Sequence, residues 1–507
     1  MSVLKKLAGE TALYGVSSIL GRVIYWFLVP LHTYVFLRPG ELSSNTELYS
    51  WVALFNVVYT FGMETAFFRF ANRSPAHRQD YFNQALTAIM VVSIVFSGGL
   101  MLAAPMLSNL LDYPGESSNI VYLALIVAID AIVAIPFARL RLEKKAKKFV
   151  QIKIINIIVN VLLNVFFLLL CRDIALGKYL TSLQPLGAFL YRPEIGPGYI
   201  FIANLIANAC FLFLLKDAFR GFQLTWKGTL FNEMWIYAYP ILILGLAGTV
   251  NQMADRWFLR HLLPQGFYAD LTSEDALGIY GSCYKLSVFM SLAIQSFKYA
   301  ADPFFFSKAE DKNAPQLLAL VMKWFVIVCV VLWVGVSLNV DFLGHFMLSK
   351  AYRVGLSVVP ILLLANLFLG IYYNLAFWFK LTDKTQFGTL ITGTGAVLTV
   401  ALNIYLIPEM GYMACAWAFL MSSVVMCALC YVLGEKYYPV PYRVVSGLGY
   451  IASAALLIYF SSFIKITNLW IAVPYHCALC LLYGVGILLV ERDSIPLNIR
   501  KKIKILG

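Results

Sequence analysis

Charged side chains are scarce in this sequence. Only 13% of its 507 residues are Asp, Glu, Lys or Arg, whereas 61% are hydrophobic, and the mean hydropathy is +0.77. Such an apolar composition excludes a soluble globular protein. No stretch between the apolar runs is longer than about 26 residues, which excludes a sizeable soluble domain. The chain is therefore expected to be an integral membrane protein.

Sequence signatures of enzymes are also lacking. Gly388 and Gly393 have the glycine spacing of the phosphate-binding pattern GxxxxGK[ST], but no lysine follows and both lie in an apolar run. No Asp-x-Asp motif for a metal-bound sugar nucleotide occurs. The longest polar segment, residues 172–197, contains only five charged residues, which is little for the paired catalytic groups of a glycan polymerase or ligase. We expect no catalytic residues.

The nine cysteines do not suggest a metal site. Most lie within apolar runs, including the pairs Cys427-x-x-Cys430 and Cys477-x-x-Cys480. Two such pairs would suggest zinc in a soluble protein. A continuous apolar helix has no turn that brings both thiolates onto one ion, and Cys packs there as a small apolar residue. We therefore expect neither a metal nor a cofactor.

Apolar runs long enough to cross a membrane recur fourteen times, since a span needs about 20 residues. They cover roughly 8–37, 46–70, 81–108, 119–140, 149–171, 198–217, 233–262, 277–303, 315–339, 354–379, 386–406, 412–437, 444–464 and 467–490. The expected fold is an all-α polytopic membrane protein with fourteen transmembrane helices.

Basic residues are distributed unevenly between alternate loops. The loops on the same side as both termini hold 25 Lys and Arg residues, most densely in 139–148 and 492–504, and the opposite loops hold 8. Cytoplasmic loops carry the excess of Lys and Arg, so both termini are expected in the cytoplasm. This topology accounts for most of the net charge of +13, and no nucleic-acid partner is needed to explain it.

One stretch of the chain occurs twice. Shifting residues 140–164 by 239 positions without a gap places Lys145 on Lys384 and Asn164 on Asn403. The Gly-Tyr pair at 198–199 recurs at 411–412, a shift of 213, so the first copy carries 26 extra residues. We interpret this longest outer loop, 172–197, as a cap or gate of unknown role.

The duplication predicts three parts: a six-helix bundle in 1–230, a second six-helix bundle in 231–440, and a helical hairpin with a basic cytoplasmic tail in 441–507. Internal repeats of transporters usually hold the substrate site at their interface. Charged residues inside the spans are therefore the candidates for a site.

Arg22 lies near the middle of the first run, where an unpaired cation costs at least about 2.5 kcal/mol. Two interpretations remain open. Arg22 forms a structural ion pair with an acid on a neighbouring helix, such as Asp130, or it is a cation of a central cavity that binds an anionic substrate. Pro30 is expected to bend the outer part of this helix.

A second set of charged residues lies in the runs 233–262 and 277–303. Gln252 and Asp255 fall on one helical face, and the adjacent Arg256 points about 100° away, so we expect Arg256 to extend outward. Lys285 lies inside the next span and needs a partner. The partner we expect is Asp255.

Asn56, Thr60 and Glu64 form a polar stripe at spacings of four residues. Glu64 is interpreted either as a structural pair with Arg69 or a neighbouring basic residue, or as a gating group. The other residues considered for coupling or gating are Asp130, Arg256 and Lys298.

Three strings resemble a known family. They are GMETAFFRF at 62–70, ADR at 254–256, and IYG at 279–281 followed by YKL at 284–286. They are similar to strings of bacterial polysaccharide-biosynthesis flippases of the Wzx type, which belong to the MOP superfamily with the MATE exporters and the lipid II flippase. The resemblance covers nearly the whole chain.

This resemblance implies two six-helix bundles around a cationic cavity, alternating access, and undecaprenyl-diphosphate-linked oligosaccharides as substrates in the bacterial inner membrane. The last two helices resemble in number those of the lipid II flippase, where they form a groove for the lipid tail. That flippase has several arginines in its first two helices, whereas the first helix here has Arg22 alone at mid-span. A peptidoglycan precursor is therefore the less expected cargo.

The site that we expect combines cations with hydroxyl-binding groups. Arg22 and Lys285 would bind the lipid diphosphate, while the cavity would also contain Asp255, Asn56, Thr60, Gln252, Tyr373 and Asn374. Expected partners are the lipid-linked oligosaccharide, membrane lipid and other membrane proteins of polysaccharide assembly.

Two other classes of function remain as alternatives. One is a MATE-like antiporter of drugs or cations, although such exporters favour buried acids without buried bases, and this chain places Arg22 and Lys285 inside its spans. The other is a membrane polymerase or ligase of glycans.

Overall fold

The computed structural model describes residues 19–307, 313–382, 384–464, 466 and 468–492. Regular structure in these residues is helical, apart from an isolated β-bridge between Tyr268 and Leu271. In the described part of the chain, twelve helices are long and apolar enough to cross a membrane, and two shorter apolar helices accompany them. These fourteen match the fourteen apolar runs one to one, so the expected polytopic all-α fold is confirmed. The first predicted run lies partly outside the described residues.

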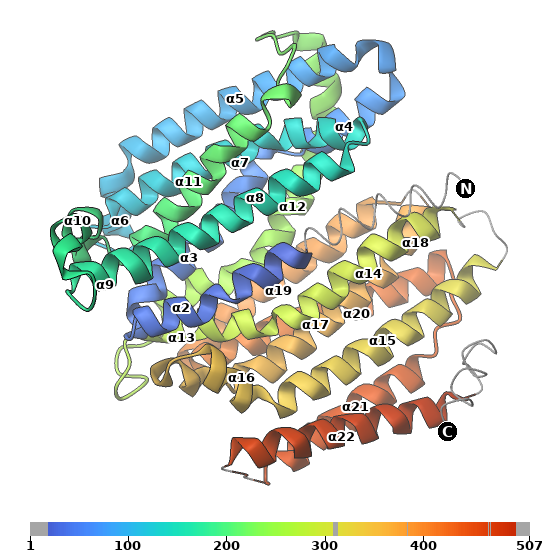
Figure 1. Ribbon diagram of the computed structural model, residues 1–507. Helices are drawn as coiled ribbons and strands as arrows, with labels where there is room; N and C mark the ends of the chain where they lie inside the picture. Colours follow the sequence, from blue (N-terminus) through green and yellow to red (C-terminus); the bar gives the residue numbers. More distant parts are fainter. Residues whose placement is uncertain (1–18, 308–312, 383, 465, 467, 493–507) are drawn as a thin grey trace.

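The first half of the chain forms one group of helices, coloured blue to green in Figure 1. Its first helix, Ile19–Val35, is interrupted at Phe27, because Pro30 has no N–H to donate one turn back. The other helices are α3 (Ser43–Thr60), α4 (Met63–Arg73), α5 (Arg78–Leu102), α6 (Ala104–Leu110), α7 (Ser117–Leu142), α8 (Ala146–Val165), α9 (Arg172–Ala175), α10 (Gln184–Leu190) and α11 (Gly198–Leu214), with α2 (Leu28–Val35) as the second part of the first helix.

The second half forms another group, coloured green to orange. Its helices are α12 (Gly228–Leu262), α13 (Ser273–Tyr284), α14 (Val288–Ser307), α15 (Ala314–Leu338), α16 (Val340–Met347), α17 (Val358–Leu375), α18 (Phe377–Leu381), α19 (Gln386–Met410) and α20 (Tyr412–Tyr437). Figure 1 shows α12 running between the two groups. It packs on α19 of its own half and on α3 and α4 of the other half.

The last two helices, α21 (Val444–Ser461) and α22 (Leu469–Val490), lie beyond α15 at the edge of the molecule (Figure 1). A buried ion pair holds them there. Lys323 of α15 donates from Nζ to Oε2 of Glu491 at 2.6 Å, and the Tyr450 hydroxyl donates to the other carboxylate oxygen at 2.7 Å. The hairpin is therefore fixed to the second half by charge as well as by apolar packing.

The segment 172–197 folds onto its own half of the chain. Helix α10 packs so closely on α9 that a Cβ on Gly187 would lie 2.8 Å from the backbone nitrogen of Ala175. Tyr199 fixes the end of the segment, because its hydroxyl donates to the Leu190 carbonyl at 3.0 Å and accepts from the Arg192 N–H at 2.7 Å. The expected role of this segment as a cap or gate stays a prediction.

The two halves meet tightly at the end of the bundles formed by residues 33–47, 260–281 and 345–356, which we call the sealed end. A short 3-10 helix, η1 (Pro39–Leu42), lies against α13, where a Cβ on Gly278 would come within 1.9 Å of the Pro39 carbonyl oxygen. The Gly40 N–H donates to Asp275 at 2.8 Å. The Tyr352 hydroxyl donates to the Phe36 carbonyl at 2.7 Å. Glycine at 278 is thus needed for the closure.

The opposite end carries the basic loops around residues 139–148, 216–227 and 380–384, and we call it the basic end. Here the halves touch where α4 begins. Gly62 has a φ of +76° and passes close to α12, since a Cβ on it would lie 2.5 Å from the Ala238 carbonyl oxygen. The Arg69 guanidinium lies 4.2 Å from the ring centre of Tyr237. Only glycine accommodates the positive φ of residue 62 so close to the Ala238 carbonyl oxygen.

Candidate functional site

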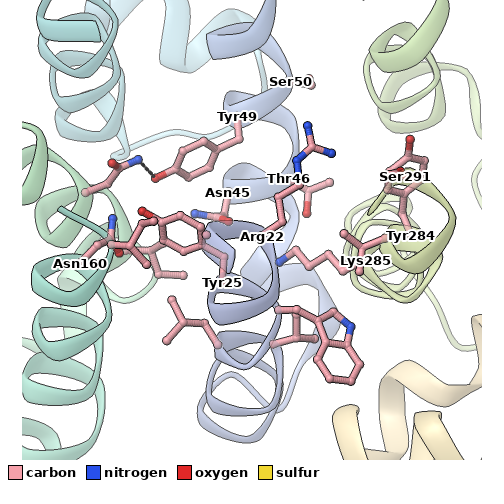
Figure 2. Close-up of a pocket in the computed structure, with 18 of the residues that line it drawn as sticks. Arg22, Tyr25, Asn45, Thr46, Tyr49, Ser50, Asn160, Tyr284, Lys285 and Ser291 are labelled. Carbon is pink, nitrogen blue, oxygen red and sulfur yellow. Dashed lines mark hydrogen bonds between the residues drawn. The ribbon is translucent and has the colours of Figure 1, made fainter. Parts of the chain in front are cut away.

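A cavity of about 1020 Å³ lies between the two halves. The first half lines it with its first helix and with α3, α7, α8 and α11. The second half contributes α12, α13, α14, α17 and the short 3-10 helix η7 (Lys285–Ser287). Figure 2 shows Lys285 extending from its helix toward the helices of the first half that carry Arg22 and Asn45. The cavity therefore occupies the interface that the repeat indicated.

The lining of this cavity is strongly cationic. Five basic side chains line it, namely Arg22, Arg141, Lys153, Arg256 and Lys285. They come from five different helices, three in the first half and two in the second. Among the described residues, the single acidic residue in the lining is Asp130. The balance of these charges depends on which cations are already paired.

Arg256 is paired, and its surroundings correct two expectations. Its Nη1 donates to Asp255 Oδ1 at 2.7 Å and to the Gln252 carbonyl at 2.9 Å. The expectation that Arg256 extends outward is wrong, because it is buried and its guanidinium lies 4.3 Å from the ring centre of Tyr284. The expected pair of Asp255 with Lys285 is also wrong, because the Asp255 carboxylate bonds instead to Arg256 and to the Tyr280 hydroxyl.

Arg141 is paired as well. It forms an ion pair with Glu64, so of the two kinds of structural partner considered for Glu64, Arg69 or a neighbouring basic residue, the structure shows the second. Through Arg141, Glu64 borders the cavity without lining it. Asn56 and Thr60 do not line the cavity either. The Thr60 hydroxyl donates to the Asn56 carbonyl at 2.6 Å, one turn back on the same helix.

The other three cations of the lining form no ion pair within the described residues. Arg22 is exposed to the cavity and has no carboxylate within 4 Å in that part of the chain, so the structure does not show the proposed pair with Asp130. Lys285 likewise has no acidic partner in the described chain. Lys153 packs its ammonium over the rings of Phe137 and Phe211, at 4.4 and 5.0 Å from their centres. These three charges are available to a ligand.

A group of asparagines lines the wall opposite Lys285. Asn156 donates from Nδ2 to Asn208 Oδ1 at 3.1 Å, and Asn208 donates to Asp130 Oδ1 at 2.9 Å. A second chain runs along α8, where Asn164 donates to Asn160 Oδ1 at 2.8 Å. These amides connect α7, α8 and α11 through buried hydrogen bonds.

Of the remaining predicted site residues, some line the cavity and others do not. Gln252 lines the cavity. Tyr373 lies behind the lining, and the ammonium of Lys298 is 4.1 Å from its ring centre. Asn374 is fully buried away from the cavity, and neither polar atom of its side chain finds a partner in the described chain. The structure thus brings Arg22, Gln252 and Lys285 together and leaves Tyr373 and Asn374 outside.

Sequence reasoning missed most of the polar wall on α8. Lys153, Asn156, Asn160 and Asn164 all line the cavity. Their spacing of three, four and four residues places them on one face of a helix, and this stripe stands out in an otherwise apolar run. The signal was present in the sequence. The repeat comparison drew attention to Asn164 alone.

The chain is similar in part to one protein family and in fold to solved membrane transporters. Residues 36–174 match a family of polysaccharide biosynthesis proteins. No curated protein sequence matches the chain. Among solved structures, the lipid II flippase MurJ in an inward closed conformation superposes with a TM-score of 0.73 and 13% identity, covering 96% of this chain and all of that one.

MATE transporters show the same fold. An inward-facing multidrug resistance transporter of the MATE family and MOP superfamily has a TM-score of 0.60 with 11% identity over 82% of this chain and 94% of that chain. The MATE multidrug transporter DinF-BH has a TM-score of 0.55 with 16% identity over 85% and 95%. These neighbours are transporters and flippases, and at such identities they establish the fold alone.

Proposed function

We propose that this multi-pass membrane protein, which has the fold of the lipid II flippase MurJ and of MATE transporters, flips undecaprenyl-diphosphate-linked oligosaccharides across the bacterial inner membrane by alternating access. The match of residues 36–174 to a polysaccharide biosynthesis family supports a glycan as the cargo. A lipid II flippase among the structural neighbours supports a lipid carrier for that glycan.

The observation that carries this proposal is the charge balance of the cavity. Arg22, Lys153 and Lys285 have no acidic partner in the described chain, whereas Arg141 and Arg256 are neutralised by acids behind them. Set against Asp130, the three unpaired cations leave two positive charges uncompensated. Cations in a membrane are costly unless something anionic compensates them. A lipid diphosphate brings about two negative charges and several strong acceptor oxygens.

The conformation supports loading from one side. The sealed end closes the cavity through η1, α13 and Tyr352, while Arg141, Phe149 and Lys153 extend its lining toward the basic end. The positive-inside rule assigns the basic end to the cytoplasm. With both termini cytoplasmic, the cavity would receive substrate from the leaflet where lipid-linked sugars are assembled.

In this mechanism the chain acts as three units, 1–230, 231–440 and 441–507. The first two would rock against each other around the cavity. The third would guide the prenyl chain, as the resemblance to the lipid II flippase implies. An apolar groove of about 280 Å³ between α15, α17, α20 and α21 supports this part, since Phe368, Ile371 and Tyr442 are among the residues that line it.

The MATE-like alternative is weaker on the same evidence. A cationic drug would enter a cavity with two excess positive charges, and desolvated like charges repel strongly. The Asp255 and Glu64 carboxylates that would attract it are already held by Arg256 and Arg141. The fold is equally compatible with both cargoes, so the charge of the cavity is the observation that favours the anionic one.

Coupling is assigned to the acids of the first half. We propose that Glu64 or Asp130 takes up a proton during the return step, because ionisable groups at membrane depth are functional candidates. Arg256 and Lys298 would adjust the gate on the other half. Transport that responds normally to imposed pH gradients in both Glu64→Gln and Asp130→Asn would reduce the two acids to structural groups.

The experiment that tests the function uses the purified protein in vesicles. A fluorescent polyprenyl-diphosphate-linked sugar is placed in one leaflet, and its arrival in the other is followed by chemical quenching. We expect flipping of this lipid and none of fluorescent phosphatidylcholine, which has no net charge. Transport of a cationic rhodamine dye in place of the anionic lipid would instead establish the exporter.

A further inference from the structure

We infer that the asparagines on the wall of the cavity formed by α3, α8 and α11 are a carbohydrate-binding site for uncharged sugar residues, separate from Arg22 and Lys285, the cations that would bind the diphosphate. The inference rests on the proposed function and deepens it, because it assigns different parts of the substrate to different walls. Its key residues are Asn45, Asn160 and Asn204, with Tyr25 and Tyr49 beside them.

The two walls differ in chemistry. In Figure 2, Asn160 lies on the side of α8, Lys285 and Tyr284 lie on the opposite side, and Asn45 lies on the helix between them. A diphosphate offers only acceptors and requires cations or N–H donors. A sugar hydroxyl both donates and accepts, and a side-chain amide presents a carbonyl oxygen and two N–H donors in one plane. Amides therefore match sugars, and cations match phosphates.

Asparagines inside membrane helices often act only as interhelical glue. That explanation covers Asn156, Asn164 and Asn208, whose amides bond across helices to Asn208, His32 and Asp130 respectively. It does not cover the rest. Asn45 is buried, lines the cavity, and its Nδ2 has no hydrogen-bond partner in the described chain. A buried amide without a partner costs about 1–3 kcal/mol, which a ligand would recover.

Two further side chains keep hydrogen-bonding capacity toward the cavity. Asn160 accepts from Asn164, but its Nδ2 donates to no group of the described chain. Asn204 donates to the Tyr49 hydroxyl at 2.7 Å, so its carbonyl oxygen and the Tyr49 proton remain available. Tyr25 and Tyr49 also bring aromatic surface to this wall, and apolar ring faces beside planar polar groups suit the two faces of a sugar ring.

The internal repeat provides a comparison within the same chain. The stripe Lys153, Asn156, Asn160 and Asn164 of α8 corresponds, at the shift of 239, to Thr392, Gly395, Thr399 and Asn403 of α19. None of these four lines the cavity.

The hydrogen bonds of the α19 copy lie within its own half, and the Asn403 Oδ1 is buried there without a partner in the described chain. Thr392 shares a hydrogen bond with the Tyr372 hydroxyl at 3.0 Å, and the Thr399 hydroxyl donates to Asn251. Asn403 donates to the Thr399 carbonyl at 2.7 Å. Only the first copy turns unused amide groups toward the cavity. We conclude that the first half binds the glycan and that the repeat is functionally asymmetric.

The test compares two probes on the purified full-length protein in detergent. One is undecaprenyl diphosphate, and the other is the same lipid carrying one N-acetylhexosamine. The wild-type protein should bind the sugar-bearing lipid more tightly. Asn45→Ala and Asn160→Ala should each weaken its binding about threefold to tenfold, the loss expected for one hydrogen bond, and leave the Kd of the bare lipid unchanged.

Two controls separate the possible failures. Asn403→Ala, at the repeat position outside the cavity, should alter neither Kd, and Arg22→Ala should weaken both lipids. If the asparagine variants bind the sugar-bearing lipid as the wild type does, or lose affinity for both lipids equally, the carbohydrate site is refuted while the flippase function stands. If the wild-type protein binds neither lipid, the proposed function fails as well. If Asn45→Ala does not fold, the same binding measurements are made with Asn45→Ser.

Discussion

Arg256 donates a hydrogen bond to the carboxylate of its own chain neighbour, Asp255, at 2.7 Å, and both side chains are buried. The Tyr280 hydroxyl holds the second oxygen of this carboxylate. The pair occupies the acid that could have neutralised Lys285. Of the two second-half cations that line the cavity, Arg256 is thus compensated by Asp255, while Lys285 faces the cavity without an acidic partner in the described chain.

This difference predicts opposite effects on stability. Asp255→Asn leaves a buried guanidinium without its counter-ion, which costs roughly 3 kcal/mol. Lys285→Ala removes a cation that has no acidic partner in the described chain, so it should leave the protein as stable as the wild type or more stable. Thermal unfolding in detergent measures both effects.

Tyr280→Phe is the matched control for this comparison. It removes one hydrogen bond and keeps the ion pair, so its effect should be about 1 kcal/mol. A greater loss of stability in Lys285→Ala than in Asp255→Asn would mean that Lys285 has a structural partner after all.

Composition and periodicity were sufficient to predict the fold. Fourteen apolar runs gave fourteen helices because the membrane requires about 20 apolar residues per span. The helix interruption near Pro30 also followed from the sequence, since proline lacks the backbone donor. The closeness of Gly278 to Pro39 could not be predicted, because it depends on how two distant segments meet at the sealed end.

The site was predictable only in part. Arg22, Gln252 and Lys285 line the cavity, since polar residues in apolar helices avoid lipid. The prediction that Asp255 pairs with Lys285 was wrong. It assumed that the adjacent residues Asp255 and Arg256 point to different faces of the helix, but the flexible Arg256 side chain turns back onto Asp255. Asn374 has the expected polar character but faces the interior of its own half. Such orientations depend on tertiary packing that one sequence does not encode locally.

A second prediction concerns the sealed end. Gly278→Ala would place a methyl group 1.9 Å from the Pro39 carbonyl oxygen, so η1 must move away from α13. Overpacking of this kind costs about 1–3 kcal/mol, which should increase the open population about fivefold or more. A cysteine at Thr46, in a background without native cysteines, should then react faster with a membrane-impermeant maleimide.

Gly248→Ala provides the control for this variant. The nearest atom to a Cβ at Gly248 lies 3.9 Å away, in Thr392, so this alanine fits without displacement and the labelling rate should not change. Equal labelling rates in the two alanine variants would show that contact between η1 and α13 does not keep the cavity closed.

A third prediction concerns orientation in the membrane. Both termini are expected in the cytoplasm because the basic loops lie on their side. Reporter fusions should indicate cytoplasm at Lys145, Thr225 and Thr382, and the opposite side at Pro114, Pro185 and Pro408. The structure places the first three beside the ends of α8, α12 and α18. Reversed results at any two of these positions would invalidate the topology.

The last prediction concerns Arg22 and Lys285, two cations of the lining that have no ion pair within the described residues. Because Arg22 and Lys285 belong to different halves and line one cavity, a diphosphate bound by both would connect the halves during transport. Hydrogen bonds to charged groups are worth about 1.5–3 kcal/mol each, so Arg22→Ala or Lys285→Ala should lower flipping of the diphosphate-linked lipid at least tenfold. Arg22→Lys should restore only part of the rate, since lysine lacks the bidentate fork of arginine.

The control for this loss of flipping is a measurement of whether the variants are inserted and folded. Both alanine variants should be inserted and should unfold at the wild-type temperature or above it, because neither cation forms an ion pair in the described chain. Flipping is measured in vesicles with equal amounts of reconstituted protein, so that lower insertion is not read as lower transport. Near-normal transport by a stably folded Arg22→Ala, Lys285→Ala double variant would mean that the diphosphate binds elsewhere or is not the ligand.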